Sequence, residues 1–458
     1  MAWRTFAVAA LVGAGSGAMA QEAVEQERIL GKFEDFIAEH KRRFVGAVER
    51  QARLAAFAEN LRFVEAENAK GTNSYRLGLT QFADMTNDHF RQHYCGYRRP
   101  AERMGGLPHL GTFEESSTPP PESIDWRQEG AVTPVKNQGQ CGSCWSFSTT
   151  GAVEGAWKIA SGLLVSMSEQ QLVDCAEGFG EAGCNGGDMD SAFKYVHQYG
   201  LDTEQSYAYK AKQLGHCEAT EGRTGIPAKA VTGYKDVRGK SEMALMQAVA
   251  MQPVSIAIEA DKQAFQLYRS GILDTPACGT QLDHGVLVVG YGTEDGQDYW
   301  IVKNSWGPAW GEQGYIRLAR GVAGAGQCGI LSEPSFPVVS TELAVVAAAG
   351  RHAHYGRPPC NDDEVTVQVQ GMEGVMCSPK CQDAACPVDV PPGTTATPQC
   401  ALQDQSGDKY CALACTEGGC PEGARCQLLG TSGICMFDAD SRPTTVQLVG
   451  GGASVINV

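Results

Sequence analysis

Residues 137–145 read Asn-Gln-Gly-Gln-Cys-Gly-Ser-Cys-Trp, and the interpretation of the whole chain starts from this stretch. Its second cysteine, Cys144, opens a segment over residues 143–160 with apolar residues at helical spacing and a stop signal at Gly162. A cysteine in the first turn of a helix faces unpaired N–H groups and the positive end of the helix dipole, which favour the thiolate. The stretch therefore predicts a nucleophilic cysteine, with Gln138 close by in sequence as a side-chain amide donor.

The alternative for Cys144 is that it forms half of a disulfide. The chain has 18 cysteines in 458 residues, which is typical of a secreted or lumenal protein. Seven of them lie between residues 121 and 340, and this odd number leaves one thiol unpaired. Parity favours a free thiol in this region without saying which cysteine carries it.

The N-terminus supports an oxidising compartment. Arg4, a short apolar stretch and the small-residue signature at residues 18–20 predict a signal peptide over residues 1–20. The alternative, a membrane anchor, is disfavoured because the apolar stretch is too short to span a bilayer, and no later segment is long enough. We expect a protein of the secretory pathway, lysosomal, vacuolar or extracellular. Its formal net charge of −16 argues against a nucleic-acid partner.

A general base is the second requirement of a cysteine nucleophile. His284 directly precedes an apolar run that predicts a strand, so its side chain can project into a cleft from the strand edge. Residues 303–311 follow as a tryptophan-rich loop, in which Asn304 could orient an imidazole and Trp306 could shield it from water. Taken singly, a histidine is more often a packed or surface residue, and such a loop is more often part of a core.

Together these motifs, with Cys-Asn-Gly-Gly at residues 184–187, resemble the papain family of cysteine proteases and stand in the family's order. The resemblance covers residues 121–340. It implies an α+β fold: a two-lobed peptidase with a helical lobe, a β-barrel-like lobe and a cleft between them. A helical pro-segment would precede it, and a small disulfide-rich domain would follow.

The resemblance also assigns roles and bridges. Cys144 would be the nucleophile and His284 its partner in a thiolate–imidazolium pair, with Asn304 orienting His284. Gln138 and the backbone N–H of Cys144 would form the oxyanion hole. Acyl transfer through a thioester would then hydrolyse peptide bonds. The implied disulfides are Cys141–Cys184, Cys175–Cys217 and Cys278–Cys328, which leave Cys144 free.

Substrate contacts follow from the same resemblance. Gly186 and Gly187 would pair with an extended substrate, and the positions expected to line the cleft and its S2 pocket are Met189, Ala257, Leu282, Trp306 and Glu333. The pocket would be apolar, with Glu333 able to accept an arginine at P2; alternatively, Glu333 is a solvated glutamate that points away. The short segment between Cys175 and Cys184 holds no long histidine-bearing insertion, which predicts an endopeptidase.

Residues 21–120 are expected to be an inhibitory pro-segment. Their helical pattern ends near residue 70, and they carry a spacing similar to that of cathepsin L-type pro-segments at Glu49, Arg53, Phe57, Asn60, Val64 and Asn68. A second pro-segment motif runs from Gly78 to Asp84, with Thr80 in place of asparagine. The segment should lie through the cleft until cleavage near residues 116–122 releases the enzyme. Cys95 has no assigned partner.

The remaining residues divide into a linker over 341–358, a cysteine-rich module over 359–440 and a tail over 441–458. The module's cysteines repeat with an offset of about 34 residues, which predicts two related disulfide-stapled units, with Cys360 and Cys426 pairing with each other or elsewhere. Its role and ligand are open: substrate or cell-wall binding, sorting, regulation, or a removable appendage. For the whole protein we expect a monomer with protein and peptide substrates, its own pro-segment as an inhibitor, and no metal or cofactor.

Overall fold

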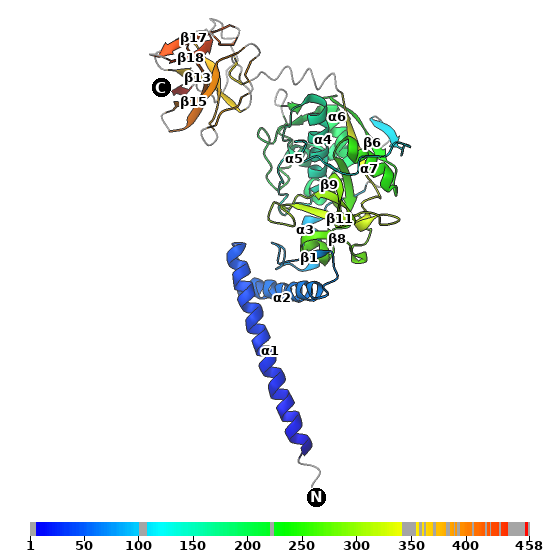
Figure 1. The fold of residues 1–458 in the computed structure, drawn as a ribbon. Helices are drawn as coiled ribbons and strands as arrows, with labels where there is room; N and C mark the ends of the chain where they lie inside the picture. The colour runs from blue at the N-terminus through cyan, green and yellow to red at the C-terminus, as the bar shows by residue number, and fades with distance from the viewer. Residues whose placement is uncertain are drawn as a thin grey trace. The chain divides into compact units, whose positions relative to one another are not determined.

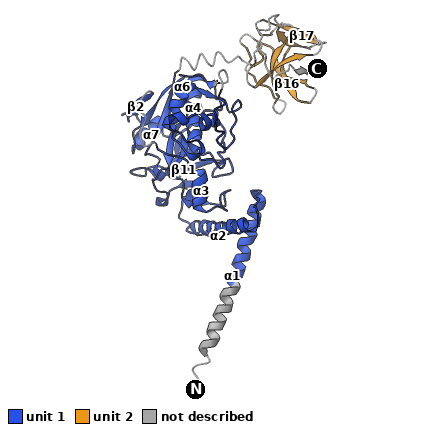
Figure 2. Cartoon of the chain, turned by 180° about the vertical axis from the view of Figure 1, so that it is seen from behind, with its two compact units in different colours: residues 1–344 blue, residues 345–458 orange. Residues whose placement is uncertain are grey.

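Figure 1 shows the computed structural model of the chain, which describes residues 6–99, 108–219, 224–340 and, with short gaps, 354–437, together with 454–456. The contacts divide it into two compact units, residues 1–344 and residues 345–458 (Figure 2). The expected linker over 341–358 and tail over 441–458 lie mostly outside the described residues. None of the described helices is both long enough and apolar enough to cross a membrane.

The first unit combines helices with one large sheet. Its α-helices are α1 (Phe6–Glu39), α2 (Ala47–Ala69), α3 (Asn87–Tyr94), α4 (Cys144–Ser161), α5 (Glu169–Cys175), α6 (Met189–Tyr199), α7 (Glu242–Met251) and α8 (Gln263–Gln266). Short 3-10 helices are η1 (Glu177–Phe179), η2 (Gly183–Asn185), η3 (Pro276–Cys278) and η4 (Gln327–Gly329). The helical pattern expected to end near residue 70 is formed by two helices, α1 and α2, separated by a segment that ends at Gly46, whose φ of 126° suits glycine.

Ten strands form the main sheet, in the order β1-β8-β11-β10-β9-β7-β12-β6-β2, with β3 paired to β9. Their bounds are β1 (Tyr75–Leu77), β2 (His109–Phe113), β3 (Ile124–Asp125), β6 (Val231–Val237), β7 (Val254–Ile258), β8 (Tyr268–Leu273), β9 (His284–Glu294), β10 (Gln297–Lys303), β11 (Tyr315–Ala319) and β12 (Ser335–Val339). A separate pair is made by β4 (Leu201–Asp202) and β5 (Thr224–Ile226). The strand expected at the apolar run that follows His284 is confirmed as β9.

Two lobes meet along α4, which packs against β9 and β7 on one side and against α5 and α6 on the other. The helical lobe gathers α4, α5 and α6, with the buried Trp145, Val153 and Trp157 on α4, while the β lobe is built on β7, β9 and β10 (Figure 1). Within the helical lobe, the Ser168 hydroxyl caps α5 by accepting from the Gln171 N–H at 3.0 Å. The expected α+β, papain-like fold is therefore confirmed.

The pro-segment shares the core of the β lobe. Strand β1 adds to the edge of the main sheet by pairing antiparallel with β8. Phe57, Phe82 and Phe90 are fully buried and belong to the same hydrophobic cluster as Trp306. Burial of large aromatic side chains contributes much of the binding energy at such contacts, so these phenylalanines help to hold the pro-segment against the β lobe.

The second unit consists of two small sheets with five disulfides. One sheet has the order β14-β13-β19 and the other β15-β16-β18-β17. The strands are β13 (Glu364–Val369), β14 (Met376–Pro379), β15 (Thr397–Gln403), β16 (Lys409–Cys415), β17 (Ala424–Leu429), β18 (Ser432–Phe437) and β19 (Ser454–Ile456). The cysteine-rich module thus contains regular strands, and β19 comes from the segment expected to be a tail.

The bridges of this unit do not repeat with the spacing of the cysteines. They are Cys360–Cys377, Cys381–Cys400, Cys386–Cys411, Cys415–Cys426 and Cys420–Cys435. Cys386–Cys411 joins a cysteine of the first sequence repeat to a cysteine of the second, so the prediction of two separately stapled units is wrong. Cys360 and Cys426 do not pair with each other. The two sequence groups pack around one core, where Cys411 and Cys435 are buried.

Candidate active site

Cys144 is the first residue of α4 and is completely buried. Its sulfur accepts a hydrogen bond from the backbone N–H of Gly285 at 3.3 Å, which places the start of β9 directly against it. Burial raises the pKa of the Cys144 thiol to about 12. The helix terminus alone would lower this pKa, but here the pro-segment covers the sulfur and desolvation outweighs the dipole.

His284 begins β9 and is held by Asn304, which follows β10. The ring nitrogen Nε2 lies 2.8 Å from the Asn304 Oδ1, and the Trp306 ring packs on the imidazole with centroids 4.7 Å apart. Burial lowers the pKa of His284 to about 4. In this covered state both groups are neutral over the intervening pH range, because the thiol keeps its proton and the imidazole does not gain one.

Gln138 lies fully buried beside the nucleophile and is held from both ends of its amide. Its Oε1 accepts from the Ser305 hydroxyl at 2.6 Å, while its Nε2 donates to the backbone carbonyls of Cys141 at 3.0 Å and Tyr94 at 3.2 Å. Tyr94 belongs to the pro-segment. A carbonyl oxygen of the pro-segment therefore already accepts from the amide that was expected to bind the oxyanion.

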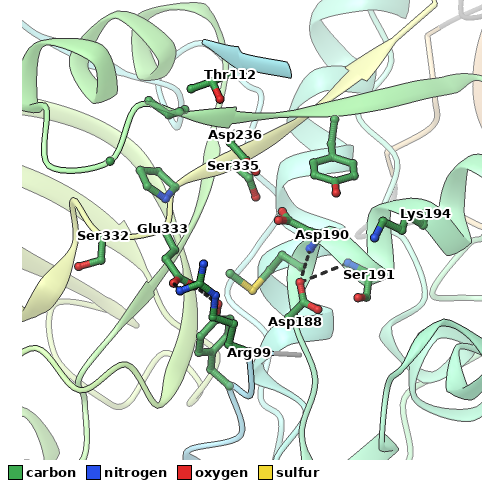
Figure 3. Close-up of a pocket in the computed structure, with 16 residues that line it drawn as sticks. Arg99, Thr112, Asp188, Asp190, Ser191, Lys194, Asp236, Ser332, Glu333 and Ser335 are labelled. Atoms are coloured by element: carbon green, nitrogen blue, oxygen red, sulfur yellow. Dashed lines mark hydrogen bonds and ion pairs between the residues drawn. The ribbon is translucent and has the colours of Figure 1, made fainter. Parts of the chain in front are cut away.

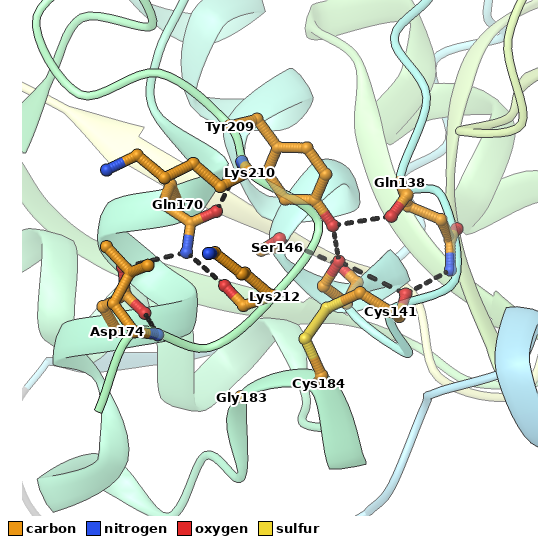
Figure 4. The surroundings of a disulfide bond; sticks show 12 residues. Gln138, Cys141, Ser146, Gln170, Asp174, Gly183, Cys184, Tyr209, Lys210 and Lys212 are labelled. Carbon is orange, nitrogen blue, oxygen red and sulfur yellow. Dashed lines mark hydrogen bonds between the residues drawn. A yellow bond between two sulfur atoms is a disulfide. The ribbon is translucent and has the colours of Figure 1, made fainter. Parts of the chain in front are cut away.

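The disulfide Cys141–Cys184 fixes the loop that carries Gln138 (Figure 4). Beside it, the Tyr209 hydroxyl donates to the backbone oxygen of Gln138 at 2.8 Å and lies 2.6 Å from the Ser143 hydroxyl. The backbone N–H of Gly142 donates to the carbonyl of Cys184 at 3.0 Å. These contacts fix the start of α4 and the Gln138 amide in position relative to each other. The other two bridges of this unit are Cys175–Cys217 and Cys278–Cys328, so Cys144 and Cys95 are its free cysteines.

The pro-segment runs along the glycine pair expected to hold a substrate backbone. Gly187 donates its N–H to the carbonyl of Gly96 at 3.0 Å and accepts from the N–H of Arg98 at 2.9 Å. Gly96 also packs against Gly142 so closely that a Cβ atom on Gly96 would lie 1.9 Å from the Gly142 carbonyl oxygen. The pro-segment thus approaches the site at Gly96 with no side chain in between. Cys95 lies between Tyr94, which contacts Gln138, and Gly96, which contacts Gly187.

A cavity of about 250 Å³ adjoins this segment and contains two of the expected pocket residues, Met189 and Glu333 (Figure 3). Arg99 of the pro-segment enters it, with a guanidinium nitrogen 2.5 Å from a Glu333 carboxylate oxygen, and the Tyr97 hydroxyl donates to the other oxygen. Glu333 therefore points into the cavity instead of away from it. Ala257 and Leu282 are not among the lining residues; Ala257 is fully buried in β7, where it pairs with Gly285.

The motif residues of the pro-segment make hydrogen bonds within the segment and to the β lobe. Asn60 donates to the carbonyls of Ala83 and Met85, at 2.8 and 2.9 Å, and Asn68 bonds both the N–H and the carbonyl of Leu77 at the end of β1. Thr80, the residue that departs from the expected asparagine, donates its hydroxyl to the backbone oxygen of Gln266 at 3.0 Å. The departure therefore keeps a polar contact with the β lobe.

Close groups of cysteine sulfurs occur in the second unit but do not form a metal centre. The two groups are Cys381, Cys386 and Cys411, and Cys415, Cys420 and Cys426. Every one of these sulfurs is in a disulfide. Disulfide sulfur is not the thiolate that binds zinc or iron, so neither group offers a ligand set.

The structure brings together Cys144, His284, Asn304 and Gln138, as the motifs indicated. The sequence did not identify the pro-segment residues that occupy the site, namely Tyr94, Gly96, Tyr97 and Arg99. Their contacts depend on tertiary docking, and the one local signal was the unpaired Cys95 beside a glycine. The unpaired Cys95 indicated where in the sequence these contacts lie, but it did not indicate what the contacts are.

Comparisons with known proteins agree with this arrangement. Residues 120–338 match the family described as papain family cysteine protease, and residues 33–90 match the cathepsin propeptide inhibitor domain. Cysteine proteinase RD21A of Arabidopsis thaliana is 52% identical over 64% of this chain, and the match spans 63% of that relative's length. Probable cysteine protease RDL2 of the same plant is 45% identical over 68% of this chain and 85% of its own length.

Solved precursors show the same fold. Digestive procathepsin L 3 of the Tenebrio molitor larval midgut matches 68% of this chain and 99% of its own, with 40% identity and a TM-score of 0.62. The recombinant stem bromelain precursor matches with 38% identity and a TM-score of 0.60, over 68% of this chain and 99% of its own. The chain therefore belongs to the papain family of cysteine proteases and carries the family's inhibitory propeptide domain.

Proposed function

We propose that this chain is the precursor of a cysteine endopeptidase in which Cys144 attacks the peptide carbonyl. His284 would take the thiol proton, pass it to the leaving amine and then activate water to hydrolyse the thioester. Asn304 would orient the imidazole from its Oδ1, and Trp306 would keep water from that hydrogen bond. Gln138 Nε2 and the backbone N–H of Cys144 would stabilise the oxyanion.

One observation carries the proposal: the Gln138 amide donates to a backbone carbonyl, that of Tyr94, beside the buried Cys144. A substrate carbonyl would need this donor at this place. The pro-segment thus occupies the position of a substrate while burial keeps thiol and imidazole neutral, which supports its role as an intramolecular inhibitor. Removing it would rehydrate both groups and favour the ion pair.

The proposed S2 pocket is apolar at Met189 and acidic at Glu333. Arg99 of the pro-segment pairs with Glu333, which supports an additional preference for arginine at P2. The short segment between Cys175 and Cys184 supports endopeptidase cleavage. A location in a lysosome-like vacuole or outside the cell, and a monomeric state, remain part of the proposal.

The experiment is a cleavage assay on the purified precursor. It is incubated at about pH 5 with a thiol reductant, to keep Cys144 reduced, and a fluorogenic Leu-Arg or Phe-Arg peptide. We expect hydrolysis that rises as the pro-segment is lost, and none from Cys144→Ala. Equal hydrolysis by both proteins, or none from either, would contradict the proposal. Mass spectrometry of the same samples shows where the chain is cut near residues 116–122 and whether the second unit is retained.

A further inference from the structure

A small cavity of about 20 Å³ adjoins the candidate catalytic residues inside the first unit. Its lining comes from both lobes and includes Glu169 at the start of α5, Gly285 in β9 and Asn304 after β10. A cavity of about 10–15 Å³ is enough for one water molecule if two or more polar groups line it. The size and the lining therefore suit a single water next to the residue that orients His284.

Two atoms of this lining have no hydrogen-bond partner among the described residues: Asn304 Nδ2 and Glu169 Oε2. Both side chains are buried, with exposed fractions of 3% and 1%. Their other atoms are well bonded, because Asn304 Oδ1 lies 2.8 Å from His284 Nε2, and Glu169 Oε1 accepts from Lys136 at 2.6 Å and Thr150 at 2.5 Å. Buried polar atoms are almost always bonded to protein or to ordered water, and here one is a donor and the other an acceptor.

We propose that one ordered water in this cavity accepts from Asn304 Nδ2 and donates to Glu169 Oε2, which makes Glu169 a positioning residue for the catalytic pair. The inference rests on the proposed function, in which Asn304 orients His284. The water would accept from the NH2 group of Asn304 and so hold the amide oxygen toward the imidazole. In the flipped orientation the NH2 group would face the imidazole instead. Burial raises the pKa of Glu169 to about 7, and above this pH the donor chain ends on a carboxylate, which makes Oδ1 a stronger acceptor for the imidazolium.

The groups around Glu169 form a buried charge network. Lys136 also bonds Glu154 at 3.1 Å, and Lys303 donates to the Thr133 hydroxyl, which in turn donates to Glu154. Glu204 is the other carboxylate that acts on Glu169. Two ammonium groups thus face Glu154 and Glu169 in the interior, and the network anchors the cavity on the side of the helical lobe.

The chain offers a matched pair of variants. In Glu169→Gln the amide oxygen is needed by Lys136 and Thr150, so the NH2 group faces the cavity and replaces the acceptor by a donor. In Glu154→Gln the same charge is removed from the same network at the same burial. Both Glu154 oxygens already have partners, Lys136 and Met167 on one and Thr133 on the other, so the acceptor toward Asn304 is kept.

The test compares both variants with the wild type after activation of the full chain, using the fluorogenic peptide. We expect Glu169→Gln to lower kcat about tenfold with KM nearly unchanged and to move the alkaline limb of the pH profile to lower pH, because the imidazolium loses support. Glu154→Gln should lower Tm about as much as Glu169→Gln does, but it should leave the alkaline limb of the pH profile unmoved. An unmoved limb in Glu169→Gln, or the same shift in both variants, would overturn the proposal.

A high-resolution crystal structure of the wild type gives a readout that does not depend on activity or on how the variants fold. We expect a water within hydrogen-bond distance of both Asn304 Nδ2 and Glu169 Oε2. If there is no electron density for a water at this position, the inference is overturned even when the enzyme is active. An inactive wild type with this water in place would instead contradict the proposed function and leave the bridge standing.

Discussion

The peptidase unit and the C-terminal unit are held together in different ways. The first buries a large continuous core that runs from the pro-segment phenylalanines to the tryptophans of the β lobe, and one of its three disulfides, Cys278–Cys328, belongs to that core. The second has a much smaller core, in which Cys411, Cys415 and Cys435 are members, and it carries five disulfides. Small domains with too little apolar surface commonly depend on such bridges.

The difference also separates structural from reactive cysteine. In the second unit every described cysteine is in a bridge, whereas the first leaves Cys144 and Cys95 free, with both placed where the pro-segment crosses the site. Bridges are needed where a core is lacking, and a free thiol is possible where a core already fixes the backbone. The following predictions test this contrast.

The largest effect is expected from the bridge that joins the two cysteine groups of the second unit. Replacing Cys386 and Cys411 by alanine should cost this unit about 2–5 kcal/mol, which is enough to unfold it. Limited proteolysis of the full chain should then degrade residues 360–435 and leave the peptidase intact. The control replaces Cys175 and Cys217, where we expect a lower Tm but a folded, active peptidase. A stable second unit without Cys386–Cys411 would show that its core suffices.

A smaller effect is expected where the pro-segment crosses the site as bare backbone. Gly96→Val would place a Cβ atom 1.9 Å from the Gly142 oxygen, so the segment must move out of the site. Overpacking of about 1–3 kcal/mol corresponds to a roughly tenfold to hundredfold rise in hydrolysis by the uncut precursor. Gly31→Val is the control, because nothing lies within 4 Å of its Cβ position. Unchanged latency of Gly96→Val would mean that the close contact is not needed for inhibition.

The smallest effect concerns the acidic side of the S2 pocket. Glu333→Ala should lower kcat/KM for peptides with P2 arginine by about tenfold and leave P2 leucine peptides unchanged, because only arginine uses the carboxylate. Glu129→Ala removes an equal charge from an exposed position and should change neither. An equal loss for both peptides in Glu333→Ala would show that Glu333 supports the pocket wall without selecting the substrate.

The fold was expected from a resemblance carried by motifs that stand on locally encoded elements, and the structure places the residues of these motifs close together. The helix after Ser143, the strand after His284 and the loop at Asn304 carry their own periodicity and punctuation, and the motifs give the order of the residues. The prediction of two separately stapled units was wrong, and the disulfide pairing itself could not be read from the sequence, because cysteine spacing repeats while three-dimensional pairing follows the sheets. The occupancy of the site by Tyr94 and Gly96 depends on docking over a long sequence separation, which no local pattern encodes.

The central claim is that the pro-segment keeps a neutral, buried thiol beneath its backbone, and the most direct test is the alkylation rate of Cys144. The precursor and the processed enzyme are treated with iodoacetamide between about pH 5 and pH 8, and labelled peptides are quantified by mass spectrometry. With burial raising the pKa of Cys144 to about 12 and lowering that of His284 to about 4, we predict almost no label in the precursor across this range. The processed enzyme should label rapidly even near pH 5. Equal labelling of Cys144 in the two forms would contradict the account.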